Sequence, residues 1–270
     1  MSYRRSWARD FERSVRDNPD WPVLVSGGDS WFSFPDEPNV IDVLDDPTGQ
    51  GRGGGQRAWS LLRLENGSDE LTTALSAGHR GELRAILDKV PVHALLWSGG
   101  GNDLIGADLL PLLKPYIAGA TPSLCLHMPR FERRLRRLED SYRELLDLVV
   151  DDGGDLKVYL NSYDYPQPSD KPVKLLGAKI PGPWLANAFR ERGYPPNDPL
   201  ERQVPRFVID CFCQMIDRLA AEYRGRLVRV ETRGAVGIDW ADEIHPNARA
   251  AQRIAERFEK ALAKGSGIGS

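Results

Sequence analysis

Little in this sequence supports a disulfide-stabilised, zinc-binding or membrane-spanning protein. It has three cysteines in 270 residues, and Cys211 and Cys213 form a C-x-C pair without a second pair to complete four zinc ligands. No run of about 18 apolar residues is present, so we expect no membrane span. The amino-terminal residues lack the apolar centre of a signal peptide, which favours a cytoplasmic location.

Excess charge of one sign is also missing. The formal net charge at pH 7 is −3, so we expect neither a nucleic acid nor a membrane surface as a partner. The one basic cluster is formed by arginines between positions 130 and 137, at the start of a helical pattern. It is typical of a solvated or salt-bridged helix face, with a phosphate site as the alternative reading.

Motifs for phosphate and metal binding are lacking too. The sequence contains no G-K-[ST] phosphate loop, no H-E-x-x-H and no G-x-S-x-G. Gly49, Gly51 and Gly54 satisfy G-x-G-x-x-G, but no strand pattern precedes them, so a flexible loop is favoured over a dinucleotide site. We therefore expect no metal and no organic cofactor.

What the sequence does contain is an alternation of short β-rich runs and longer helical patterns. Strands are predicted at Val23–Ser26, Leu71–Ser76, Val92–Trp97, Lys157–Ser162 and Leu227–Glu231. The clearest helices are predicted at Glu132–Val149, Glu201–Tyr223 and Asn247–Ala263, where apolar residues recur at intervals of three and four. This alternation predicts a parallel sheet with helices on both faces.

Three connections are too long to be simple loops, at residues 35–57, 104–131 and 163–200. The third is rich in proline and aromatic residues. It either shapes a pocket or lid, or is a surface insertion without a catalytic part. Residues 266–270 are predicted to be a flexible tail, and residues 1–265 to form one domain with these three insertions.

Polar residues follow two of the predicted strands. The first strand is followed by two glycines and then by Asp29 and Ser30. Ser30 is either a nucleophile or a helix cap. The strand that ends at Trp97 leads through glycines to Asn102. In a sheet of order 2-1-3-4-5, these two strands flank the point where strand order reverses and ligands bind. We therefore expect Ser30 and Asn102 to lie close together.

A third polar group lies near the end of the chain, where His245 follows Asp242 by three residues. A carboxylate that accepts the Nδ1–H bond fixes the tautomer and orientation that an imidazole base needs. In the alternative reading, Asp242 caps the last helix, Pro246 lies in its first turn, and His245 is a surface residue.

Together these residues resemble the SGNH (GDSL-type) hydrolase family. Gly28-Asp29-Ser30 matches the family's first block, Gly100-x-Asn102-Asp103 its third and Asp242-x-x-His245-Pro246 its fifth. The blocks occur in the family's order and span nearly the whole chain. The resemblance implies a flavodoxin-like α/β fold with three layers, in which helices cover both faces of a parallel five-stranded sheet of order 2-1-3-4-5.

The resemblance also implies a catalytic role for each of these residues. Ser30 would be the nucleophile, His245 the general base and then acid, and Asp242 the carboxylate that orients the imidazole. The oxyanion hole would combine the Ser30 N–H, the Asn102 side chain and the N–H of a glycine that ends the second strand. With that strand at Leu71–Ser76, we assign this glycine to Gly78.

Two residues beside Gly78 leave alternatives open. Gly81, three positions further on, is the other candidate for the oxyanion hole. His79 is interpreted as a residue of the surface or the pocket rim, with a second base as the alternative.

Two departures from the family's pattern concern the pocket. Trp31 and Phe32 follow Ser30 where the family commonly has leucine, and with Trp184 they are predicted to line the substrate pocket. Ala250 stands where the family often has a glycine for close helix packing. Neither change touches a catalytic group.

The resulting expectation is a serine esterase that hydrolyses carboxylic esters, with a lean toward short acyl chains, through an acyl-enzyme. The substrate would be a small-molecule, lipid or sugar ester. Alternatives within the family are a lysophospholipase, a thioesterase, or an acyltransferase that passes the acyl group to a sugar or alcohol. An alternative of another class is a binding protein that keeps the fold without the activity.

Overall fold

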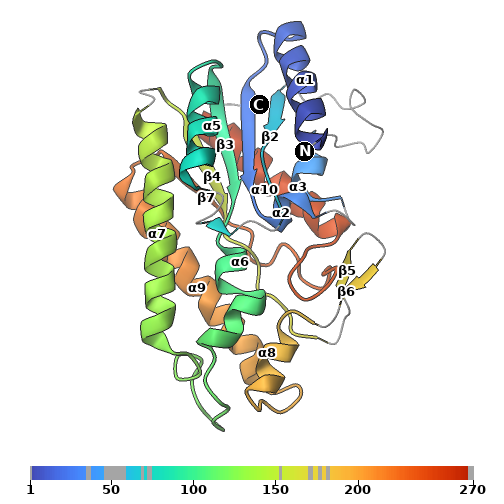
Figure 1. The fold of residues 1–270 in the computed structure, drawn as a ribbon, viewed down its shortest axis with the longest axis vertical. Coiled ribbons are helices and arrows are strands. Elements are labelled where there is room, and N and C mark those ends of the chain that lie inside the picture. Colours follow the sequence, from blue (N-terminus) through green and yellow to red (C-terminus); the bar gives the residue numbers. More distant parts are fainter. Residues whose placement is uncertain are drawn as a thin grey trace.

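An all-parallel sheet of five strands forms the centre of the protein (Figure 1). The computed structural model describes residues 2–34, 38–45, 59–67, 70–71, 75–151, 154–169, 173–175, 178–180 and 183–266. The glycine motif at 49–54, most of the 35–57 connection and the end of the tail lie outside these residues. The strands of the sheet are β1 (Val23–Gly28), β2 (Ser60–Arg63), β3 (Val92–Ser98), β4 (Lys157–Asn161) and β7 (Leu227–Val230).

The strand order is β2-β1-β3-β4-β7, which is 2-1-3-4-5 in chain order. The predicted α/β fold with this order is therefore confirmed. The inner strands are apolar along nearly their whole length because both faces of the sheet are covered. β1 and β3 lie side by side, so Gly28 pairs with Ser98 and the turns after the two strands meet at one edge.

Helices cover both faces of the sheet (Figure 1). On one face, α1 (Ser2–Asp17) contacts β2, and α10 (Ala248–Ser266) contacts β3, β4, β7 and α3 (Val40–Asp45). On the other face, α7 (Met128–Asp151) packs against β4 and lies between α5 (Ala77–Leu87) and α9 (Pro199–Glu222). The three clearest predicted helices thus correspond to α7, α9 and α10.

The carboxyl end of the sheet carries the short elements. They are α2 (Ser30–Ser33), α6 (Gly101–Leu104), the 3₁₀ helix η1 (Gly106–Leu112) and α8 (Ala186–Glu191). A two-stranded antiparallel hairpin, β5 (Val173–Leu175) with β6 (Ala178–Ile180), lies within the predicted 163–200 insertion. No described helix combines the length and apolar character that crossing a bilayer requires.

The predicted position of the second strand is wrong. The second strand is β2, Ser60–Arg63, whereas Leu75 and Ser76 lie in a turn just before α5. This strand is short and ends in a charged residue, Arg63, which is unusual for a buried strand. Its guanidinium is nevertheless only 9% exposed, because it pairs with Glu65 at 2.6 Å and Asp42 at 2.7 Å. Both partners lie outside the strand, so the strand's own residues do not reveal the compensation.

Candidate active site

The turn after β1 presents Ser30 at the carboxyl end of the sheet. Gly28 has φ +121°, and a Cβ atom there would lie 1.6 Å from the Ser98 carbonyl oxygen, so only glycine fits. Asp29 then caps α2, because its carboxylate accepts the Trp31 N–H at 3.1 Å. Ser30 is the first residue of α2, so its own N–H has no acceptor within the helix. The helix cap is therefore Asp29, and the Ser30 side chain does not serve as the cap.

Ser30, His245 and Asp242 form a continuous hydrogen-bonded chain. His245 Nε2 lies 2.9 Å from Ser30 Oγ, and His245 Nδ1 lies 2.7 Å from Asp242 Oδ2. All three side chains are buried. The ring of Phe34 stacks on the imidazole of His245 at a centroid distance of 4.0 Å and covers one of its faces. Ser30 and His245, which are 215 positions apart in the sequence, are therefore in contact.

Asp242 is held by its own loop. Its Oδ1 accepts the N–H groups of Ile244 and His245, both at 2.8 Å, while Trp184 Nε1 lies 3.4 Å from Oδ2. Burial alone would raise the pKa of Asp242, but the hydrogen bond and the charge of His245, with the two backbone N–H groups, lower it below its usual value. An ionised Asp242 is the form that can accept Nδ1–H and leave Nε2 to accept a proton.

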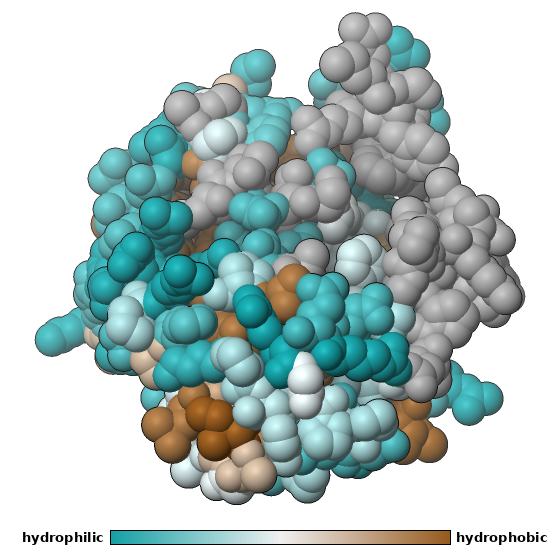
Figure 2. All heavy atoms as spheres, turned by 60° about the horizontal axis from the view of Figure 1, so that its bottom comes forward, coloured by the Kyte–Doolittle hydropathy of each residue, from teal (hydrophilic) through white to brown (hydrophobic). Residues whose placement is uncertain are grey.

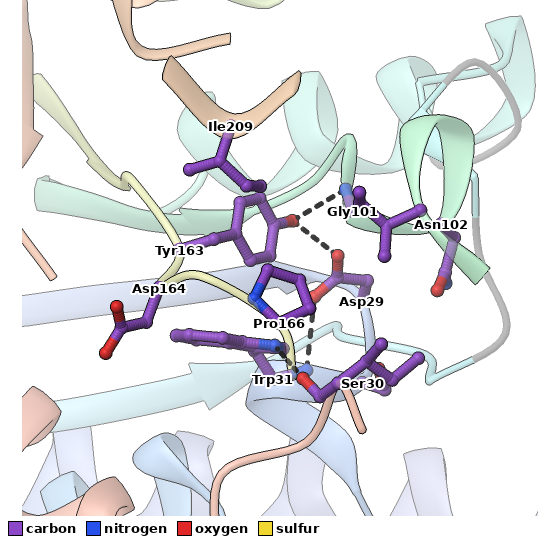
Figure 3. A pocket seen from close by; sticks show the side chains of 11 residues that line it. Asp29, Ser30, Trp31, Gly101, Asn102, Tyr163, Asp164, Pro166 and Ile209 are labelled. Carbon is purple, nitrogen blue, oxygen red and sulfur yellow. Dashed lines mark hydrogen bonds between the residues drawn. The ribbon is translucent and has the colours of Figure 1, made fainter. Parts of the chain in front are cut away.

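Asn102 lies in α6, directly after the β3 turn, and it borders the pocket beside Ser30 (Figure 3). Its Nδ2 donates to the carbonyl oxygen of Gly67 at 3.3 Å. Gly67 belongs to the loop after β2, which runs beside β1 because the Asn66 N–H donates to the Gly28 carbonyl. A Cβ atom on Gly67 would lie 3.2 Å from Ser33 Oγ and 3.7 Å from Ser30 Cα. A glycine thus lies next to Ser30 and Asn102.

The expected position of Gly78 is wrong for the same reason as the second strand. Gly78 lies in the first turn of α5 and does not end a strand. The alternative, Gly81, lies further along the same helix, where a Cβ atom would meet nothing within 4 Å. His79 is also in α5 and contacts Ser76. Gly67 was missed because it follows a strand that was not recognised.

Sequence reasoning also missed a buried network under Ser30. Asp29 accepts a hydrogen bond from the Ser98 hydroxyl at 2.6 Å. It also accepts one from the Tyr163 hydroxyl at 2.5 Å, and the Tyr163 oxygen accepts the Gly101 N–H at 3.0 Å (Figure 3). Burial raises the pKa of Asp29, against these hydrogen bonds and the Trp31 N–H, which lower it. Tyr163 therefore joins the turn that carries Ser30 to the turn that carries Asn102.

A small pocket opens between these two turns (Figure 3). Its cavity volume is about 30 Å³, and its lining residues are Asp29, Ser30, Trp31, Gly101, Asn102, Ile105, Tyr163, Asp164, Pro166, Ile209 and Ile244.

The three predicted pocket residues have different positions. Trp31 lines the pocket and donates its indole N–H to the Ile244 carbonyl at 3.0 Å. Phe32 does not line it, because its side chain is fully buried against Phe258 of α10. Trp184 is also not a lining residue and contacts Asp242.

The described residues contain no group of three or more His, Cys, Asp or Glu side chains placed to hold a metal ion. The three cysteines are free thiols, and Cys125 and Cys213 are buried. In the arginine cluster, Arg134 donates to the carbonyl oxygens of Asp103 and Asp108 and forms an ion pair with the Asp108 carboxylate at 3.3 Å. Arg134 is thus salt-bridged, as one of the two interpretations of the arginine cluster expected.

No protein-family model matches the sequence, and no curated protein matches it significantly. Solved structures do match. An extracellular lipase from Streptomyces rimosus is 12% identical, with a TM-score of 0.53 over 89% of this chain and 99% of that one. A protein from Slackia heliotrinireducens that is assigned to the SGNH hydrolases is 10% identical, with a TM-score of 0.52 over 90% and 100%.

The chain has the fold of the SGNH hydrolases. An aryl esterase from M. smegmatis shares this fold at 14% identity, with a TM-score of 0.51 over 90% of this chain and 99% of the esterase. At these identities the likeness concerns the fold, whereas the site residues rest on this protein's own sequence and geometry. On the SGNH fold, Ser30, Asn102 and His245 all lie at the carboxyl end of the sheet.

Proposed function

We propose that this protein is a serine ester hydrolase of the SGNH type, with Ser30, His245 and Asp242 as its catalytic triad. The observation that carries the proposal is the hydrogen-bonded chain from Ser30 Oγ through the imidazole to Asp242, with links of 2.9 Å and 2.7 Å. A serine hydroxyl is a weak nucleophile unless an adjacent base takes its proton, and this arrangement supplies an oriented base.

In the proposed reaction, His245 Nε2 takes the proton of Ser30 as Oγ attacks the ester carbonyl. The carbonyl oxygen becomes an oxyanion, the tetrahedral intermediate collapses, and the imidazolium donates its proton to the departing alcohol. Water then attacks the acyl carbonyl with His245 again as the base, the ester bond to Ser30 Oγ breaks, and the imidazolium returns its proton to Ser30 as the acid leaves. Asp242 stays ionised throughout and stabilises the imidazolium.

We assign the oxyanion hole to the Ser30 N–H, the Asn102 amide and the Gly67 N–H. Gly67 replaces Gly78 because it follows the observed second strand and lies against Ser30. The Asn102 Nδ2 group already points toward this loop, since it donates to the Gly67 carbonyl. Donors fixed in this way stabilise developing charge without having to reorient during the reaction.

The pocket favours a short acyl group, such as acetyl. Its volume of about 30 Å³ is only two to three times the ~10–15 Å³ that one water molecule needs on the same measure. Tyr163, Ile209 and Ile105 border it. The visible surface at this end of the sheet is largely hydrophilic (Figure 2), which favours a water-soluble ester over an aggregated lipid.

The test is hydrolysis of p-nitrophenyl esters with two to twelve acyl carbons. The wild type should be fastest on the shortest esters, and Ser30→Ala should fall to the background rate. Ser33→Ala is the matched control, because Ser33 lies in the same short helix, and its hydroxyl bonds only the Asp29 carbonyl among the described contacts. Equal rates for wild type and Ser30→Ala would refute the proposal.

A further inference from the structure

Glu243 is a fully buried carboxylate that the proposed reaction does not use. It follows Asp242 directly, its side chain is 0% exposed, and none of the ion pairs found among the described residues involves it. A buried carboxylate without a cation is costly unless hydrogen bonds compensate it. Its position between Asp242 and His245 in the catalytic loop therefore calls for an explanation.

The compensation comes from three backbone N–H groups of one distant segment. Ser169 N donates to Oε1 at 2.6 Å, Leu185 N to Oε2 at 2.5 Å, and Ala186 N to Oε1 at 3.2 Å. In addition, Gln167 N donates to the Glu243 carbonyl oxygen at 3.0 Å. Burial raises the pKa of Glu243, and these three N–H groups oppose that shift while they hold the carboxyl group in place.

These donors lie on both sides of the β5–β6 hairpin. Ser169 precedes β5, while Leu185 and Ala186 follow β6. A single carboxylate thus fastens the two ends of this segment to the loop that carries the base and its acid. Each oxygen is used, Oε1 by both ends and Oε2 by Leu185 alone.

The second end of the segment also reaches the triad. Trp184 immediately precedes Leu185, and its indole Nε1 lies 3.4 Å from Asp242 Oδ2, the oxygen that faces His245 Nδ1. Because the Leu185 N–H is fixed on Glu243, the backbone that carries the indole is fixed as well. The contacts form one path, from Glu243 through Trp184 to Asp242 and His245.

We propose that Glu243 is a positioning residue, which clamps the backbone at Ser169 and at Leu185 and Ala186 onto the catalytic loop and holds the Trp184 indole against Asp242. The clamp keeps the acid and the imidazole aligned with Ser30. The catalytic part of this inference rests on the proposed function, whereas the clamp itself does not depend on it.

The decisive variant is Glu243→Gln, which keeps the shape but places an amide NH₂ where a backbone N–H donates. Glu191→Gln is the matched control, since Glu191 is an exposed residue at the end of α8 in the same part of the chain. We expect kcat on a short ester to fall by about ten- to a hundredfold in Glu243→Gln, since small displacements at a catalytic site have effects of this size. KM should change much less, and Glu191→Gln should match the wild type.

Trp184→Phe and the double variant test the path. Trp184→Phe should lower kcat in the wild-type background and have little further effect in Glu243→Gln, because the clamp is already lost there. Additive effects would overturn the path. If Glu243→Gln does not fold, Trp184→Phe alone decides, and a wild-type kcat in that variant overturns the proposal.

Limited trypsin digestion separates failure of the clamp from failure of the proposed function. Cleavage after Lys174 or Lys179, in the hairpin, should be faster in Glu243→Gln than in Glu191→Gln at a temperature where both are folded. A wild type without esterase activity would refute the proposed function, and the digestion would still test the clamp. Unchanged cleavage and unchanged kcat in a folded Glu243→Gln would refute the inference alone.

Discussion

Removing the hydroxyl of Tyr163 tests the network under Ser30. Tyr163→Phe deletes the hydrogen bond to the Asp29 carboxylate and leaves the Gly101 N–H without its acceptor. A hydrogen bond to a charged group contributes about 1.5–3 kcal/mol, and an unsatisfied buried donor costs about 1–3 kcal/mol. Since Gly101 is only half-buried, water can reach part of this site. We expect a loss of about 2–4 kcal/mol in the free energy of unfolding.

The loss should depend on pH in a defined direction. Without the tyrosine donor, the raised pKa of Asp29 rises further, because burial is then opposed by fewer hydrogen bonds. The variant therefore loses most relative to the wild type where Asp29 is ionised, at high pH. The difference should shrink as pH falls through the pKa of Asp29, since a protonated carboxyl needs the donor less.

Urea denaturation at several pH values measures both effects. Tyr116→Phe is the matched control, because its hydroxyl also donates to a carboxylate, Asp198, at 3.0 Å, but Tyr116 is only half-buried. It should lose much less. A Tyr163→Phe protein as stable as Tyr116→Phe, or a deficit that does not change with pH, would refute the assignment of the network.

Two further predictions concern the turn after β3. Asn102→Ala should lower kcat by about two to three orders of magnitude with little change in KM, since one oxyanion donor contributes roughly 3–4 kcal/mol. Steady-state kinetics measures this effect, and a kcat near that of the wild type would exclude Asn102 from the oxyanion hole. Burial raises the pKa of Asp103 to about 7, against the N–H of Leu71. Native Asp103 therefore binds a proton between its unfolded pKa near 4 and pH 7, and it favours the folded state less as pH rises through that window. Asp103→Asn should flatten this part of the pH–stability curve, and parallel curves for variant and wild type would show that Asp103 does not titrate there.

The parts of the fold that could be predicted are those with a continuous local signal. Strands β1, β3 and β4 are apolar runs, and α7, α9 and α10 carry a clear helical periodicity, so sequence alone identified them. β2 has a charge in its last position that only Asp42 and Glu65 explain. Long-range compensation of this kind leaves no periodic pattern. Because the second strand was placed wrongly, Gly78 was assigned to the oxyanion hole instead of Gly67, which follows β2.

The site divides in the same way. Asp242 and His245 lie three residues apart, and their contact follows from one loop, so their pairing could be predicted. The proximity of Ser30 and Asn102 could be predicted from the strand order, because the two strands that precede them are neighbours in the sheet. Tyr163 and Glu243 could not be found, because their partners are more than 50 residues away and neither residue belongs to a motif that would reveal the contact. Tyr163 begins a proline-rich connection and Glu243 lies beside Asp242, and nothing in the sequence around either residue points to its distant partners.

The hydrogen bonds within the Asp242 loop have a mechanical consequence. Because Asp242 Oδ1 binds the backbone N–H groups of Ile244 and His245, the acid and the base behave as one rigid body. Ser30 belongs to a second body, the end of β1. The two parts meet at the Ser30–His245 contact, and the Trp31 indole bonded to the Ile244 carbonyl and the Phe34 ring stacked on His245 fasten them to each other. Any movement of one part against the other would change the distance of proton transfer. A transplanted Asp242–His245 loop would carry the contact between acid and base to another scaffold. That scaffold would still have to supply the serine, the oxyanion hole and backbone donors for Glu243.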